Sequence, residues 1–212
     1  MDGNNRFSKK NNLNKFQAYS AGAKNLIELS DKIFNKTNIN YITAFALSRH
    51  NLKRPKKIID IILKILNEYV DRSLIEKRNF SIEFRGDLSF LNIDIIKKIK
   101  LLEKKNKSFD KKLIILLNYS GKQDIVESFI KIKSKKISIN SDNIYKNLTL
   151  FDIPDPDMIL RTGGFQRVSD FLLFNISFTE LFFSKKLWPE FKYNDFSKYI
   201  EKYKKTERKF GI

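Results

Sequence analysis

A short apolar run that ends in an arginine and two glycines is the part of the chain best suited to bind an anion. The apolar residues 158–160 precede Arg161, glycines occupy 163–164, and Arg167 and Ser169 follow. An apolar run closed by glycines is typical of a buried strand and its exit loop. Ligands of open α/β sheets bind beyond the carboxyl ends of strands. Two guanidinium groups and a hydroxyl there suit a phosphate or diphosphate, although composition alone leaves a surface turn with two solvated arginines as a second interpretation.

Two further stretches carry polar groups of the same kind. Residues 1–7 (MDGNNRF) combine an acid, a glycine and an arginine, and residues 48–55 (SRHNLKRP) combine a hydroxyl, an amide and an arginine. Glu180 stands alone in a Phe-rich segment, where a buried unpaired charge would be costly. An Asp-Gly-Asn-Asn run by itself predicts only a turn, so the first stretch is informative together with the others.

In this order and at this spacing, the motifs resemble the signatures of the cis-prenyltransferase family. Residues 161–169 and 180–191 resemble its C-terminal signature, residues 1–7 its N-terminal signature, and residues 48–55 its middle motif. The resemblance covers essentially the whole chain. It implies a homodimeric transferase that condenses isopentenyl diphosphate with an allylic diphosphate primer to give a cis-polyprenyl diphosphate, with Mg²⁺ as cofactor.

The resemblance also implies roles for individual residues. Asp2 would hold Mg²⁺ and be indispensable for the reaction, and Glu180 would be a second acid near the metal. Asn51 would remove a proton or position the group that does so. The substrate-binding residues would be Gly3, Asn4, Asn5, Arg6, Phe7, Lys15, Ser48, Arg54, Arg161, Arg167 and Ser169. The last three would bind isopentenyl diphosphate, and residues 3–6 would surround the allylic diphosphate.

The chain departs from the family pattern at several of these places. The replacements are Asn5 for a glycine, Tyr19 for a histidine, His50 for a glutamate, Leu52 for a tryptophan, Phe165 for a glutamate and Asp170 for an asparagine. The strand that precedes the aspartate in the family is also absent ahead of Asp2. We therefore expect Asp2 to lie on a loosely held terminus and the natural product to begin upstream with a short apolar run.

The rest of the sequence predicts the elements that position the motifs. Strands are predicted over residues 39–47, 80–86, 113–117 and 158–160, and helices over 13–35, from Pro55 onward, over 91–102, over 125–130 and over 194–205. Residues 1–12 predict a loop, and Ser141 is the predicted cap of a short helix that runs to Leu148. Alternating strands and helices predict one α/β domain over residues 1–212, with a mainly parallel, twisted sheet flanked by helices. The helix after Pro55 would wall an apolar tunnel for the growing prenyl chain.

Composition limits the other classes of function. The 212 residues contain no cysteine and one histidine, which excludes a disulfide framework and most zinc sites. No apolar run approaches the ~20 residues that span a bilayer. A cytoplasmic protein is therefore predicted, with peripheral contact at the inner face of the membrane for product release.

The net charge of +18 raises the question of nucleic-acid binding. The lysines accompany abundant Asn, Ile, Phe and Tyr, a set that an A/T-rich genome encodes, so we expect any DNA binding to be weak, sequence-independent and salt-sensitive.

Three hypotheses therefore stand, of which the active enzyme is favoured. The second is a catalytically weak or inactive family member that acts as a partner subunit. The missing strand favours it, and the retention of Asp2, Arg161, Arg167 and Glu180 opposes it. The third is a basic nucleic-acid-binding protein, which would need a recognised module or aromatic residues interleaved with the basic ones, and the sequence has neither.

Overall fold

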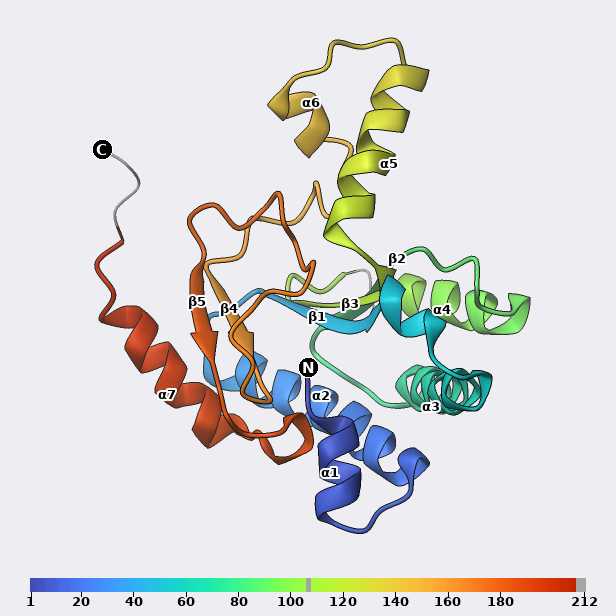
Figure 1. Cartoon of the computed structure of the whole chain (residues 1–212), viewed down its shortest axis with the longest axis vertical. Helices are drawn as coiled ribbons and strands as arrows, with labels where there is room; N and C mark the ends of the chain where they lie inside the picture. The colour runs from blue at the N-terminus through green and yellow to red at the C-terminus, as the bar shows by residue number, and fades with distance from the viewer. Residues whose placement is uncertain (106–107, 209–212) are drawn as a thin grey trace.

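In the described part of the chain, five parallel strands in two sheets form the framework of the protein (Figure 1). The larger sheet contains β1 (Tyr41–Ser48), β2 (Ser81–Gly86) and β3 (Lys112–Tyr119) in the order β1-β3-β2. The smaller sheet pairs β4 (Met158–Arg161) with β5 (Glu180–Phe183). Each strand pair is parallel, which confirms the predicted sheet type.

The structure is a computed structural model that describes residues 1–105 and 108–208. Helices connect the strands and flank the sheets, as predicted. They are α1 (Asn4–Lys10), α2 (Lys15–Lys36), α3 (Lys56–Ile75), α4 (Ile93–Lys105), α5 (Gly121–Ser134), α6 (Ser141–Tyr145) and α7 (Tyr193–Lys204), with 3-10 turns η1 (Arg49–Lys53) and η2 (Trp188–Glu190). No helix in the described part of the chain is long and apolar enough to cross a bilayer.

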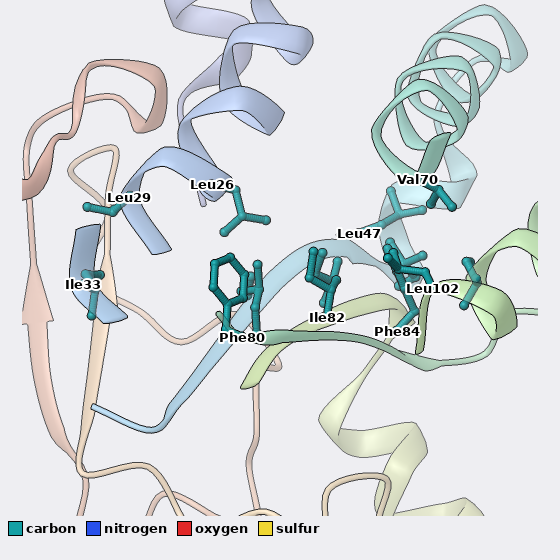
Figure 2. Close-up of a cluster of buried hydrophobic side chains, with 14 of the residues drawn as sticks. Leu26, Leu29, Ile33, Leu47, Val70, Phe80, Ile82, Phe84 and Leu102 are labelled. Carbon is teal, nitrogen blue, oxygen red and sulfur yellow. The ribbon is translucent and has the colours of Figure 1, made fainter. Parts of the chain in front are cut away.

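The central strand β3 is buried on both faces, as a continuous apolar run in a parallel strand requires. Leu113, Ile115 and Leu117 belong to the main core under α2, α3 and α4. Figure 2 shows that core, with Leu26 of α2, Val70 of α3 and Leu102 of α4 around the strands. On the opposite face, Ile114 and Leu116 pack against Leu150, Ile153 and Leu172, which lie in irregular segments.

Two predictions, one about the first residues of the chain and one about the start of α6, were wrong. Residues 4–10 form α1 and not a loop. The helix begins after Gly3, whose carbonyl accepts the Phe7 N–H at 2.8 Å, and it packs against α2. Residues 4–10 show no helical apolar period, because Ser8 is the buried residue of this helix. The cap of α6 is Asn140 and not Ser141, and α6 ends at Tyr145.

The helix predicted over residues 125–130 is α5, and most of its apolar residues face outward. Val126, Phe129 and Ile130 are 50%, 43% and 59% exposed. The inner face of α5 is largely polar, because the buried Asp124 carboxylate accepts hydrogen bonds from the Tyr119 hydroxyl and from the Thr149 N–H and hydroxyl. Polar contacts therefore fix α5, and its outer face carries an apolar surface.

A cavity of about 760 Å³ lies between the two sheets. Residues 38–46, which include most of β1, line one side, and residues 153–162, which include β4, line another. Within the described residues β1 pairs with β3 and β4 pairs with β5. The other edge of β1 and the other edge of β4 therefore have no strand partner. Apolar residues of α2 and α7, among them Leu29, Ile33 and Phe196, also line the cavity.

This geometry predicts that an added strand would stabilise the protein. A segment of about six valines and isoleucines joined ahead of Met1 should enter between β1 and β4 and raise the Tm by ~5 °C or more, because it pairs two open edges and buries apolar side chains. Thermal unfolding followed by circular dichroism measures the effect. A glycine-serine segment of equal length is the control, and an equal Tm for the two extended chains would contradict the prediction.

Candidate active site

The backbone of Asp2 is held by two segments far away in the sequence. Its N–H donates to Thr162 Oγ1 at 3.1 Å, and its carbonyl accepts from the Thr162 hydroxyl at 3.2 Å and from the Trp188 N–H at 2.9 Å. Asn25, which is buried on α2, in turn donates to the Trp188 carbonyl at 2.8 Å. These bonds contradict the prediction that Asp2 would lie on a loosely held terminus.

The Asp2 carboxylate lies between two arginines. Its Oδ2 is 3.1 Å from Arg161 Nη2 and its Oδ1 is 3.6 Å from Arg6 Nη2. The Asp2 side chain is 34% exposed and that of Arg161 is 16% exposed. The fold therefore joins the N-terminal motif to the end of β4 through a partly buried charged cluster.

Arg161 also organises the loop that follows β4. Its Nη1 donates to Ser169 Oγ at 2.7 Å and to the carbonyl oxygen of Arg167. The structure thus brings together Arg161, Arg167 and Ser169, the three residues that the sequence suggested for one diphosphate.

Gly163 allows this loop to approach Asp2 closely. Its φ is +88°, and a Cβ there would lie 2.7 Å from Arg6 Nη2 and 3.1 Å from the Asp2 Cβ. The Gly163 N–H donates to the Lys186 carbonyl at 2.7 Å, so the loop is also fixed from the other side. Any other residue at 163 would have a strained backbone conformation, and its side chain would push the loop away from Asp2 and Arg6.

Phe165, at the tip of this loop, lies among three arginines. Its ring centroid is 4.2 Å from Arg167 Cζ, 4.9 Å from Arg6 Cζ and 5.7 Å from Arg161 Cζ. These distances are within the range of cation–π contacts.

The middle motif meets the same cavity from the end of β1. Ser48, Asn51 and Arg54 line it together with Asp2, Arg161, Arg167 and Ser169. Arg54 Nη1 donates to the Tyr19 hydroxyl at 3.0 Å, and that hydroxyl donates to Asn5 Oδ1 at 3.3 Å. The Asn51 amide makes no hydrogen bond with another described residue, so it is free to bind a ligand in the cavity.

Other predicted residues lie outside this cluster. Gly3 and Asn4 adjoin Asp2 at the start of α1, and Phe7 lies one turn further along that helix. Lys15 begins α2, and its ammonium makes no ion pair with the described residues. Glu180 begins β5 and pairs with Met158, whereas Arg161 pairs with Phe183, so Glu180 lies at the far end of the strand pair, ~10 Å away along the strand.

The residues around Asp2 fit a magnesium ion that is shared with substrate phosphates. No group of three or more acidic or histidine side chains gathers to hold a metal within residues 1–105 and 108–208. Mg²⁺ commonly keeps several waters and takes one or two carboxylates plus phosphate oxygens. The partly exposed carboxylate of Asp2, on the wall of the large cavity, is placed where it would supply one such ligand.

Three residues that the sequence analysis did not assign to the site hold it together. Thr162 fixes Asp2, Tyr19 links Asn5 to Arg54, and Phe165 contacts three arginines. Tyr19 and Phe165 stood out as departures from the family pattern, which was a signal. Thr162 gave none, because its role depends on a bond between residues 160 positions apart.

Comparison with known proteins agrees with the geometry. The family model described as putative undecaprenyl diphosphate synthase matches residues 1–211. An isoprenyl transferase of Thermotoga maritima is 38% identical over 219 residues, covering 100% of this chain and 94% of the relative. Dehydrodolichyl diphosphate synthase 4 of Arabidopsis thaliana is 33% identical and is covered over 77% of its length.

Solved structures show the same fold. Lavandulyl diphosphate synthase from Lavandula x intermedia, in complex with dimethylallyl diphosphate, superposes with a TM-score of 0.92 at 26% identity, covering 100% of this chain and 95% of that one. A probable undecaprenyl diphosphate synthase from Campylobacter jejuni gives a TM-score of 0.81 at 34% identity, covering 91% and 93%. With a family model that spans nearly the whole chain and a charged cluster built from the family's own motifs, this protein belongs to the cis-prenyltransferases.

Proposed function

We propose that this chain condenses isopentenyl diphosphate with an allylic diphosphate to give a cis-polyprenyl diphosphate. The observation that carries the proposal is one cavity whose wall holds Asp2, Asn51, Arg54, Arg161 and Ser169. A cluster of cationic and hydrogen-bonding groups beside one carboxylate suits two diphosphates and a divalent cation. The family to which the chain belongs supports the same reaction.

The reaction needs charge stabilisation, orientation and removal of one proton. The carbon–oxygen bond of the allylic diphosphate breaks, diphosphate leaves, and the double bond of isopentenyl diphosphate forms the new carbon–carbon bond at the allylic carbon. A proton lost from the isopentenyl unit then restores a double bond. Arg6 and Arg54 would stabilise the departing diphosphate, and Arg161, Arg167 and Ser169 would hold the other substrate.

Asp2 would hold Mg²⁺, with Glu180 as the second acid, and the ion when bound supplies positive charge for the leaving diphosphate. The side-chain amide of Asn51 lines the cavity and makes no hydrogen bond with another described residue. A neutral amide is a weak base, so we assign Asn51 to orienting the group that accepts the proton.

A second cavity, of about 120 Å³, supports a site for the prenyl chain. It lies among α2, α3 and the larger sheet, and its walls include Leu26, Ile62, Leu66 and Leu117. Tyr19 also lines it, which places one part of this cavity beside the residues proposed for the allylic diphosphate. We propose it as the start of the tunnel that keeps the growing chain away from water.

We also propose that two copies of the chain pair through the outer face of α5. The exposed residues Val126, Phe129, Ile130, Ile137 and Ile139 gather on α5 and just after it. Since Glu180 and Asp2 lie apart in one chain, a magnesium site that includes both would require Glu180 from the second copy.

A cytoplasmic location with peripheral contact at the membrane completes the proposal. The net charge of +18 favours an anionic lipid surface, where a polyprenyl product would leave.

The second candidate function, a weakly active partner subunit, is favoured by the departures around residues 50–52. The ordered contacts of Asp2 and Arg161 favour the enzyme instead.

Replacing Asp2 by alanine should abolish turnover while the fold persists. The fold should persist because the side chain is at the cavity wall and not in the core. Turnover should fall because the loss of the carboxylate removes ~4 kcal/mol of charge stabilisation, about a thousandfold in rate. Incorporation of radiolabelled isopentenyl diphosphate at saturating Mg²⁺ measures the effect, with Asp94→Ala, a change at an exposed acid on α4, as the control. Retention of more than about a tenth of the wild-type rate would refute the assignment.

Truncating Arg161 or Arg167 should separate the two substrates. Either alanine variant should raise the KM for isopentenyl diphosphate about tenfold or more, and that for the allylic primer much less, because a charge-assisted hydrogen bond to one diphosphate is lost. Steady-state kinetics with each substrate varied in turn makes the test. Arg72→Ala on the exposed side of α3 is the control, and equal effects on both KM values would show that the site is assigned wrongly.

An acid in the apolar face of α5 should separate the proposed dimer. Phe129→Asp would bury a charge between the two copies, which costs several kcal/mol, so sedimentation analysis should show monomer where the wild type shows dimer. Ile75→Asp, at an 82% exposed position at the end of α3, is the matched control. An unchanged dimer in Phe129→Asp would place the interface elsewhere.

A further inference from the structure

We propose that Phe165 is a positioning residue for the diphosphate of the isopentenyl substrate. Its ring would gather the guanidinium groups of Arg6, Arg161 and Arg167 into one cluster without neutralising their charge. This inference deepens the proposed function, since it concerns how the same site recognises one of its two substrates.

The contacts of Phe165 join three separate segments. Arg6 lies on α1, Arg161 ends β4, and Arg167 follows in the loop, yet all three guanidinium carbons are within 6 Å of one ring centroid. The ring is 41% exposed, although it is large and apolar. Burial in the core therefore does not explain its position, whereas attraction between the ring face and the cations does.

Arg167 depends on the ring more than the other two arginines do. Arg161 and Arg6 each contact the Asp2 carboxylate, and Arg161 also bonds Ser169. The guanidinium of Arg167 has no hydrogen bond or ion pair with any residue in 1–105 or 108–208, and it has the shortest distance to the ring, 4.2 Å. The stack on Phe165 is thus the contact that orients Arg167 before a ligand binds.

The charge balance explains why an aromatic ring suits this position. Three guanidinium groups surround the ring, and among the described residues Asp2 pairs with two of them, Arg6 and Arg161, so like charges repel unless something holds them. A carboxylate at residue 165 would hold them and also cancel one charge. The ring attracts cations through its quadrupole and carries no net charge, so the cluster keeps its surplus positive charge for a diphosphate.

The loop backbone keeps the ring in this place. Gly163 and Gly164 have φ values of +88° and +84°, and the Gly164 N–H donates to the Ser184 carbonyl at 2.8 Å. These features reverse the chain directly before Phe165 and fasten it to the segment after β5. The backbone that carries the Phe165 ring is therefore held by a fixed turn.

The test compares Phe165→Leu, which keeps an apolar side chain of similar size, with Phe165→Tyr, which keeps the aromatic face. We expect Phe165→Leu to raise the KM for isopentenyl diphosphate about tenfold while kcat and the KM for the allylic primer stay within about twofold. Phe165→Tyr should match the wild type. An unchanged KM in Phe165→Leu, an equal loss in both variants, or an equal rise for both substrates would overturn the proposal.

A double-mutant cycle tests whether Phe165 acts through Arg167. The KM of Arg167→Ala should rise little further when Phe165→Leu is added, because Arg6 and Arg161 are also held by Asp2 and Arg167 is the cation that depends on the ring. Fully additive effects would overturn the proposal.

Calorimetric titration with inorganic diphosphate separates this inference from the proposed function. If the wild type turned over no prenyl substrate but bound diphosphate more tightly than Phe165→Leu did, the proposed function would fail and the positioning role would stand. If diphosphate bound equally to both, the positioning role would fail. Thermal unfolding of each variant identifies any that has lost its fold, and Phe165→Tyr then decides the outcome.

Discussion

The site depends on the bonds that tie the backbone of Asp2 to Thr162 and Trp188. They connect the first residues of the chain to the end of β4 and to the turn η2, which lie 160 or more positions away. Without them, a carboxylate near a chain end would sample many positions, and an ion pair with Arg161 would form only part of the time. The pairing of Arg6 and Arg161 with one carboxylate follows from this connection.

Buried polar contacts join several segments of this fold. The buried Asn25 amide and the Trp188 indole N–H, which donates to the Gly22 carbonyl at 2.8 Å, join α2 to η2. The buried Asp124 carboxylate does the same for α5 and the segment around Thr149. Because such groups are costly to bury without partners, they specify one arrangement of the loops around the site. Because Asp124 makes these contacts on the inner face of α5, the apolar residues of that helix face outward.

The two cavities divide the chemistry of the proposed reaction between different parts of the fold. Charged and amide side chains near the ends of β1 and β4 line one part of the large cavity, whose other walls are largely apolar, whereas the small cavity is lined mainly by apolar side chains of α2, α3 and the larger sheet. Tyr19 belongs to the small cavity and bonds Arg54 of the large one. A substrate with a diphosphate head and a prenyl tail would therefore meet both environments within a short distance. The Tyr69 hydroxyl lines the small cavity, and burial raises its pKa, which keeps the phenol neutral.

The sequence alone determined the fold class and most elements, because periodicity and glycine positions act locally: the run 113–117 is β3 and the residues after Pro55 are α3. It also identified Arg161, Arg167 and Ser169 as neighbours, since they share one loop. It missed α1, which has little apolar face, and the outward face of α5, whose orientation depends on Asp124 meeting Thr149. Only the tertiary structure decided that Asp2 is held by Thr162, that Tyr19 links Asn5 to Arg54, that Phe165 lies among three arginines, and that Glu180 lies at the far end of its strand pair. Each of these depends on side chains from distant segments meeting in space, which no local pattern encodes.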